Sequence, residues 1–219
     1  MASRARRKDS TCIAEECPRG TQVKCIKTVQ NIEDCCMLLQ HTKNILFCEY
    51  VDGENHHYWF QFKADTVPLF VCNLEEYAEK YCPDWEGRKS DYLLIGKEND
   101  ECYIIVIELR KQFTREKQVI NKIDQLKQSI KNITSHILPH LDHLQKFQNV
   151  CFFETAKINY KIVGIAIPVV HSMRRVKQTK QPFLINGYEA QIINIPHTCI
   201  KNCQMTWTGL LNELQNKKS

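Results

Sequence analysis

The sequence lacks any apolar segment long enough to cross a membrane. A spanning helix needs about 18 to 20 apolar residues, whereas the longest apolar runs here have the length of a strand. The basic start, MASRARRKDS, is not followed by the apolar core of a secretion signal. Internal repeats and low-complexity tracts are also missing. We therefore expect a cytoplasmic protein with no membrane partner.

Several common enzyme motifs are absent as well. The sequence contains no GxxxxGKS/T, GxGxxG, GxSxG or HExxH, which argues against nucleotide-binding P-loops, dinucleotide sites, serine hydrolases and zinc proteases of the usual kinds. A cysteine–histidine nucleophile stays open, because no local signature among the 12 cysteines and 8 histidines selects one pair. The formal net charge of +5 is compatible with a nucleic-acid partner but does not indicate one by itself.

Cysteine is abundant, yet no CxxC pair occurs. Cys48 and Cys151 lie inside apolar strand patterns, where cysteine behaves as a small core residue. Without a secretion signal, we expect free thiols in a reducing compartment. A zinc site stays open for the cysteines nearest the N-terminus, although their spacing is irregular for one: Cys12, Cys17, Cys25, Cys35 and Cys36.

The patterning divides the chain into two parts. Residues 1–24 show no periodicity and are expected to form a basic, poorly ordered arm, while residues 25–219 form a single α/β domain with its core at about 70–170. Strand patterns are found at Asn44–Val51, Tyr58–Lys63, Asp91–Ile95, Cys102–Leu109, Val150–Glu154, Lys161–Val170 and Gln191–Ile195. Helical patterns are found at Val29–His41, Leu74–Tyr81 with Asn73 as N-cap, Val119–Ile133, Leu141–Phe147 and Trp207–Gln215.

Two acidic residues stand at the ends of neighbouring core strands. Asp91 opens one apolar run, and Glu108 ends the run YIIVIE. Because side chains alternate faces along a strand, Val106, Glu108 and Arg110 share one face of theirs. The two strands can pair as a hairpin in which the numbers of paired residues add up to an odd value. Asp91 then lies opposite Val106 and diagonal to Glu108, within reach of a shared ion. If the numbers add up to an even value, the two acids lie on opposite faces of the sheet.

A pair of carboxylates suits a hard divalent cation. Mg²⁺ or Mn²⁺ takes oxygen ligands and keeps several waters, which leaves positions for a phosphate oxygen and an attacking water. The alternative is that each acid lies at the solvent edge and Glu108 forms a surface ion pair with Arg110. The combination of both acids, the apolar run and the following amphipathic helix favours the metal site.

An acid that opens a strand, a short turn, and an apolar strand ending in Glu-x-Arg resemble the PD-(D/E)xK, or restriction-endonuclease-like, nuclease superfamily over roughly residues 70–135. The resemblance implies a central mixed β-sheet flanked by helices and metal-dependent endonuclease cleavage of DNA or RNA, with Asp91 and Glu108 as metal-binding and catalytic residues. An acid of the preceding helix is often a further metal ligand in this family, and of Glu75, Glu76 and Glu79 we favour Glu76. The resemblance also implies a homodimer and a role in defence or repair.

The sequence departs from the family motif at its lysine. Arg110 occupies that position and Lys111 follows it. An arginine stays protonated, so Arg110 can stabilise charge but cannot act as a base. Three alternatives follow: Arg110 takes the electrostatic role, a bulge re-aims Lys111 into the site, or the site is inactive. The last alternative gives a second hypothesis, a non-catalytic nucleic-acid-binding or assembly protein on the same scaffold.

Two polar segments are candidates for nucleic-acid contact. The helix after Arg110 carries a polar stripe beside its apolar face, and a basic segment without acids follows the strand Lys161–Val170. A solvated helix face is the alternative for the first segment, and ordinary solubility for the second. The candidate residues are Gln118, Lys122, Gln125, Arg174, Arg175 and Lys177.

Overall fold

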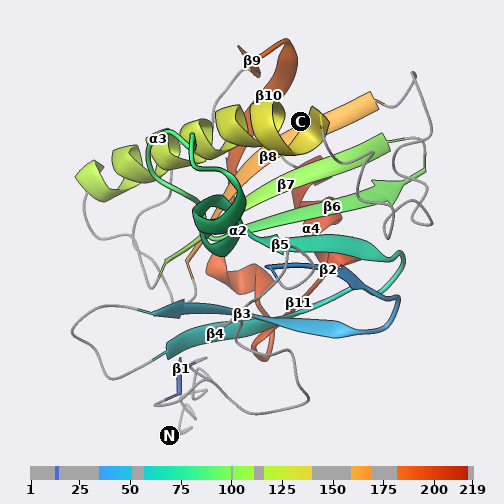
Figure 1. Ribbon diagram of the computed structural model, residues 1–219. Helices are drawn as coiled ribbons and strands as arrows, with labels where there is room; N and C mark the ends of the chain where they lie inside the picture. Colours follow the sequence, from blue (N-terminus) through green and yellow to red (C-terminus); the bar gives the residue numbers. More distant parts are fainter. Residues whose placement is uncertain are drawn as a thin grey trace, which may run out of the picture.

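The centre of the computed structural model is a seven-stranded mixed sheet (Figure 1). The model describes residues 13–14, 35–50, 57–99, 101–110, 116–139, 159–168 and 182–216. In sheet order, the strands are β2 (Cys36–Leu39), β5 (Leu69–Asn73), β6 (Tyr92–Glu98), β7 (Glu101–Arg110), β8 (Asn159–Pro168), β10 (Tyr188–Asn194) and β9 (Phe183–Ile185). Neighbours from β2 to β7 are antiparallel, whereas β8 runs parallel to both β7 and β10.

Both faces of this sheet are covered. A second sheet forms around β4 (His57–Lys63), and this sheet and α4 (Trp207–Asn216) pack on one face of the central sheet. The other face is covered by α2 (Leu74–Tyr81) and α3 (Glu116–Asn132), which Figure 1 shows side by side. The remaining strands of the second sheet are β1 (Ile13–Ala14), β3 (Asn44–Tyr50) and β11 (Gln204–Thr206). The expected α/β class, with a central mixed sheet flanked by helices, is therefore confirmed.

Strand β7 shows how the sequence builds the two cores. Ile105, Ile107 and Leu109 belong to the core toward the second sheet and α4, whereas Ile104 and Val106 belong to the core under α2 and α3. The alternation agrees with the faces predicted from the sequence. Because both faces are apolar, the one charged side chain in the buried part of the strand, Glu108, needs partners inside the protein.

Most predicted elements are found where the pattern placed them. Asn73 caps α2, since its Oδ1 accepts a hydrogen bond from the Glu76 N–H at 3.2 Å. The hairpin of β3 and β4, the central strand β8, and the helices α3 and α4 are confirmed. Helix α3 is followed by a π-helical turn, Ile133–Ile137.

One helix prediction is wrong. Cys36–Leu39, which was expected to be helical within Val29–His41, is strand β2 and pairs with β5. Apolar spacing over so short a run fits both structures, and pairing with the edge of the sheet decides between them. Strand β5 itself was not predicted. The predicted elements Leu141–Phe147 and Val150–Glu154 lie outside the described residues.

Three expectations about the whole chain have different outcomes. Of residues 1–24, the structure describes only Ile13–Ala14, which pair with β4, so the disordered arm stays a prediction. The expectation of free thiols is confirmed for Cys35, Cys36, Cys72, Cys82, Cys102 and Cys199, but it is wrong for Cys203, which is disulfide-bonded. Within the described ranges, no helix is both long and apolar enough to cross a membrane.

Candidate active site at the ends of β6 and β7

The hairpin of β6 and β7 brings Asp91 and Glu108 to the same level of the sheet. Tyr92 pairs with Ile107, and the ladder continues to Glu98 paired with Glu101. This register places both acids on the same face of the sheet, as the acid pair requires. It differs by two residues from the register that was expected. Asp91 therefore falls beside Glu108 rather than diagonal to it, and the Asp91 N–H donates to the Ile107 carbonyl at 3.0 Å.

The carboxylate of Glu108 is buried and held by two side chains of α3. Only 1% of Glu108 is exposed, and it forms an ion pair with Lys122. Gln125 donates from Nε2 to Glu108 Oε2 at 2.8 Å, and Lys122 donates from Nζ to Gln125 Oε1 at the same distance. The three side chains form a closed polar network in an apolar core, so the buried charge is compensated.

This network revises two predicted roles. Lys122 and Gln125 were expected to contact a nucleic-acid backbone, but only 6% and 7% of these residues are exposed, and both are bonded to Glu108. They reach it together because residues three apart lie on the same face of a helix. Lys122 thus supplies a buried ammonium group next to Glu108. The sequence analysis expected this positive charge to come from Arg110 or Lys111. The side chain of Arg110 is half-buried, and Lys111 lies outside the described residues.

The pKa of Asp91 is raised above that of an ordinary aspartate. Burial raises its pKa to about 6, an effect opposed by the Leu109 N–H, which donates to Asp91 Oδ2 at 2.5 Å, and by the positive charge of Lys122. The negative charge of Glu75 raises the pKa, and Arg110 lowers it. The two acids therefore share one electrostatic environment, in which Lys122 acts on both.

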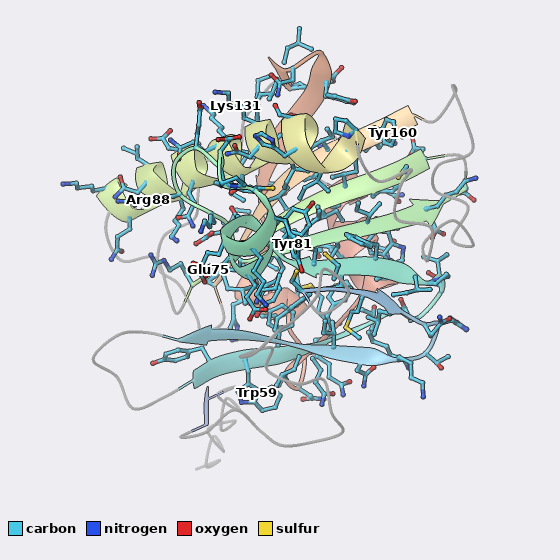
Figure 2. All side chains as sticks on the ribbon, viewed as in Figure 1. Trp59, Glu75, Tyr81, Arg88, Lys131 and Tyr160 are labelled. Atoms are coloured by element: carbon cyan, nitrogen blue, oxygen red, sulfur yellow. The ribbon has the colours of Figure 1, made fainter. Side chains whose placement is uncertain are left out.

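Two acids of α2 act on different groups. Glu75 acts on Asp91, whereas the charge of Glu76 raises the pKa values of Cys35 and Cys72. Figure 2 labels Glu75 on α2. Glu76 as a metal ligand stays a prediction.

A buried asparagine missed by the sequence analysis lies on the same level of the sheet. Glu108 pairs with Ala166 of β8, and Ala166 pairs with Asn194 of β10. Asn194 is only 2% exposed, and it shares the α3-covered face with Ile192 two residues before it. The small side chain of Ala166 lies between the two polar residues. A polar residue ending a core strand, as in QIIN, is the signal that could have found it.

The loop that leads into Asp91 is held along α3 by polar side chains rather than by a strand. Asn132 Oδ1 accepts from the Glu86 N–H at 3.2 Å, and its Nδ2 donates to the Glu86 carbonyl at 2.9 Å. Gln128 accepts from the Arg88 N–H at 3.0 Å, and Ser129 accepts from the Ser90 N–H at 2.8 Å. Gln125 donates to the Lys89 carbonyl. Figure 2 labels Arg88 in this loop and Lys131 on α3.

Gly87 lets the loop approach α3 closely. It has φ +76°, and a Cβ at this position would collide with the side-chain amide of Gln128. The polar side of α3 thus positions the segment before Asp91. The sequence analysis expected this side to contact substrate or solvent.

The acid pair fits a divalent cation by donor type. Mg²⁺ or Mn²⁺ is commonly held by one or two carboxylates and completes its shell with water and substrate oxygens. Among the residues that the structure describes, no group of three or more His, Cys, Asp or Glu side chains is arranged to hold a metal ion. If a cation binds here, Asp91 and Glu108 are the carboxylates that would hold it, and the ion would compete with Lys122 for Glu108.

Of the remaining predicted nucleic-acid contacts, Gln118 is the one that the structure describes. Gln118 is exposed on α3, and its contact with nucleic acid stays a prediction. Arg174, Arg175 and Lys177 lie outside the described residues.

No family model, curated protein or solved structure matches the chain. The residues and geometry of the chain itself therefore carry the functional assignment.

We expect Asn132→Ala to loosen the loop before Asp91. The substitution leaves the Glu86 N–H and carbonyl without their side-chain partner, which should lower the free energy of unfolding by about 1–3 kcal/mol. Urea unfolding measures this loss, and hydrogen exchange should show faster exchange at the Glu86 amide. Asp124→Ala, on the exposed side of α3, is the control. Equal stability of both variants would contradict the role of the polar contacts.

We also expect Asp91→Asn to be more stable than the wild type at pH 8 but not at pH 4. The native pKa, about 6, lies above the value of about 3.9 in an unfolded chain. The stability contributed by the Asp91 proton is thus present below pH 4 and lost as the pH rises through 6. Asparagine keeps the acceptor for Leu109 and has no charge to bury, so its advantage at pH 8 should be about 3 kcal/mol, from about 1.36 kcal/mol for each unit of the pKa difference. Urea unfolding at both pH values, with Asp124→Asn as control, measures the difference. An identical difference at both pH values would contradict the burial of a titrating carboxyl.

Proposed function

We propose that the chain is a metal-dependent nuclease with a restriction-endonuclease-like core. The observation that carries the proposal is the level placement of Asp91 and Glu108 on neighbouring strands, with the Lys122 ammonium bonded to Glu108. Two carboxylates and one lysine are the groups needed for phosphodiester hydrolysis assisted by a cation.

Each residue has a distinct role in this proposal. Asp91 and Glu108 hold Mg²⁺ or Mn²⁺, which when bound supplies an acidified water and neutralises charge on the phosphorus. Lys122 stabilises negative charge that develops on the phosphate, and Arg110 adds positive charge at the same edge of the sheet. Gln125 positions Lys122 against Glu108 and ties both to the loop at Lys89. The substrate is the backbone of DNA or RNA.

The proposal includes the loss of one contact when metal binds. Glu108 is neutralised by Lys122 in the structure, so a cation held by Glu108 would compete with this ion pair. Lys122 would then be available to stabilise negative charge on a phosphate. A homodimer and a role in defence or repair follow from the family resemblance alone.

The second candidate is a non-catalytic nucleic-acid-binding protein on the same scaffold. The closed network around Glu108 favours it, because Lys122 and Gln125 satisfy the carboxylate without a metal. This candidate binds nucleic acid in a salt-sensitive manner without cleaving it, and its melting temperature does not rise with Mg²⁺ or Mn²⁺.

The test is cleavage of labelled single- and double-stranded DNA and RNA in the presence of Mg²⁺ or Mn²⁺. We expect cleavage by the wild type, and a loss of about 100-fold to 1,000-fold in Glu108→Gln and in Lys122→Gln, because each removes a charge that acts on the reacting phosphate. Glu101→Gln is the matched control, since Glu101 lies at the opposite end of β7 and pairs with Lys161. Salt-sensitive binding without cleavage would favour the second candidate, and full activity of Glu108→Gln would contradict the site assignment.

A further inference from the structure

Two thiols outside the acid-pair site face each other across neighbouring strands. Cys36 of β2 and Cys72 of β5 are direct partners in an antiparallel ladder. Their sulfur atoms are 2.8 Å apart, and both residues carry free thiols. Direct antiparallel partners have Cα atoms about 4.5 or 5.5 Å apart, which lies within the range that a disulfide bridges.

We propose that Cys36 and Cys72 form a reversible cross-strand disulfide that fastens β2 to the central sheet. Closing the bond brings the sulfurs to about 2.05 Å, so little movement of the strands is needed. Hydrogen peroxide is the oxidant. It oxidises one thiol to a sulfenic acid with release of water, and the second thiol displaces a further water as the sulfur–sulfur bond forms. Two thiols thus lose two protons and two electrons in total, and hydrogen peroxide is reduced to two waters.

The position of β2 supplies the access that this reaction requires. Cys36 and Cys72 are 3% and 1% exposed, so neither meets a dissolved oxidant while the strand is docked. Strand β2 is the edge of the seven-stranded sheet and pairs only with β5 among the described strands. An edge strand held on one side opens locally at a lower free energy than the centre of the sheet. Oxidation should therefore be slow and should follow the opening of β2.

The surroundings of the pair favour slow oxidation and argue against a metal site. Burial raises the pKa of Cys72, which keeps the thiol protonated and weakly nucleophilic. At Cys36 a hydrogen bond with Cys35 lowers the pKa, but the hydrogen bond with Cys72 and burial outweigh it. Cys35 and Cys82 belong to the same core cluster, yet no three-ligand metal group occurs in the described residues. The direct contact of the Cys36 and Cys72 sulfurs across two paired strands suits a disulfide.

The disulfide would also fix the strand that leads to Asp91. Strand β5 continues directly into α2, and the Leu74 N–H donates to the Asp91 carbonyl at 3.0 Å. Cys72 is two residues before Leu74. The proposal itself does not depend on the nuclease activity, because it concerns only the two thiols and the stability of the edge strand.

The test uses the full chain, first reduced and then treated with hydrogen peroxide. Free thiols are blocked with N-ethylmaleimide in denaturant, and tryptic peptides are analysed by mass spectrometry without reduction. We expect peptides 28–43 and 64–80 to be linked through Cys36 and Cys72, with fragmentation separating Cys36 from Cys35. Dithiothreitol should abolish the link. The oxidised chain should melt about 5–10 °C higher than the reduced chain, because the bridge closes a long loop in the unfolded state.

Variants distinguish this pair from the other cysteines. Cys36→Ala and Cys72→Ala should each remove the link and the rise in melting temperature, whereas Cys35→Ala and Cys102→Ala should keep both. Full alkylation of Cys36 and Cys72 after peroxide treatment of the wild type would overturn the proposal without any variant. A link from Cys72 to Cys35 or Cys82, or stoichiometric zinc that protects the thiols, would overturn it equally.

Discussion

The ion pair between Glu108 and Lys122 is the interaction on which the candidate site depends. A carboxylate near the end of a strand that is buried on both faces is tolerated only if it is paired and hydrogen-bonded. Lys122 and Gln125 provide both from α3, so the same contact fixes the helix over the ends of β6 and β7. The site and the packing of this helix are therefore one feature, and a change in Glu108 should affect both.

The polar contacts of α3 extend this coupling beyond the acids. Gln125, Gln128, Ser129 and Asn132 hold the backbone of the loop before Asp91, at positions where a further strand would otherwise supply partners. Asp91 is thus placed by two supports, the β7 ladder on one side and the α3-bound loop on the other. A helix that supports both acids holds them in fixed positions, which is the preorganisation that the proposed phosphate chemistry would need.

Local patterns in the sequence predicted most helices and strands and the face on which each side chain lies. They did not predict which side chains contact one another across different elements. The alternation in YIIVIE placed Glu108 on the same face as Val106, and the apolar stripe of α3 identified its buried side, because both depend only on the period of the backbone. The register of the hairpin was left open, since strand ends and turn length decide it, and Asp91 is level with Glu108 rather than diagonal to it. Lys122 looked like a surface cation for the same reason, because its contact with Glu108 depends on how α3 lies across the sheet. The edge strand β2 was taken for helix, as short apolar runs fit either structure.

The most direct test of the account is the binding of Mn²⁺ measured by isothermal titration calorimetry near pH 7.5, where Asp91 is ionised. If the acid pair holds the cation and Lys122 competes for Glu108, the wild type binds one Mn²⁺ per chain and Lys122→Gln binds it more tightly. Glu108→Gln should then bind no Mn²⁺ at the same concentrations. Equal Mn²⁺ affinity in the wild type and Glu108→Gln would contradict the claim that these strands carry a metal site.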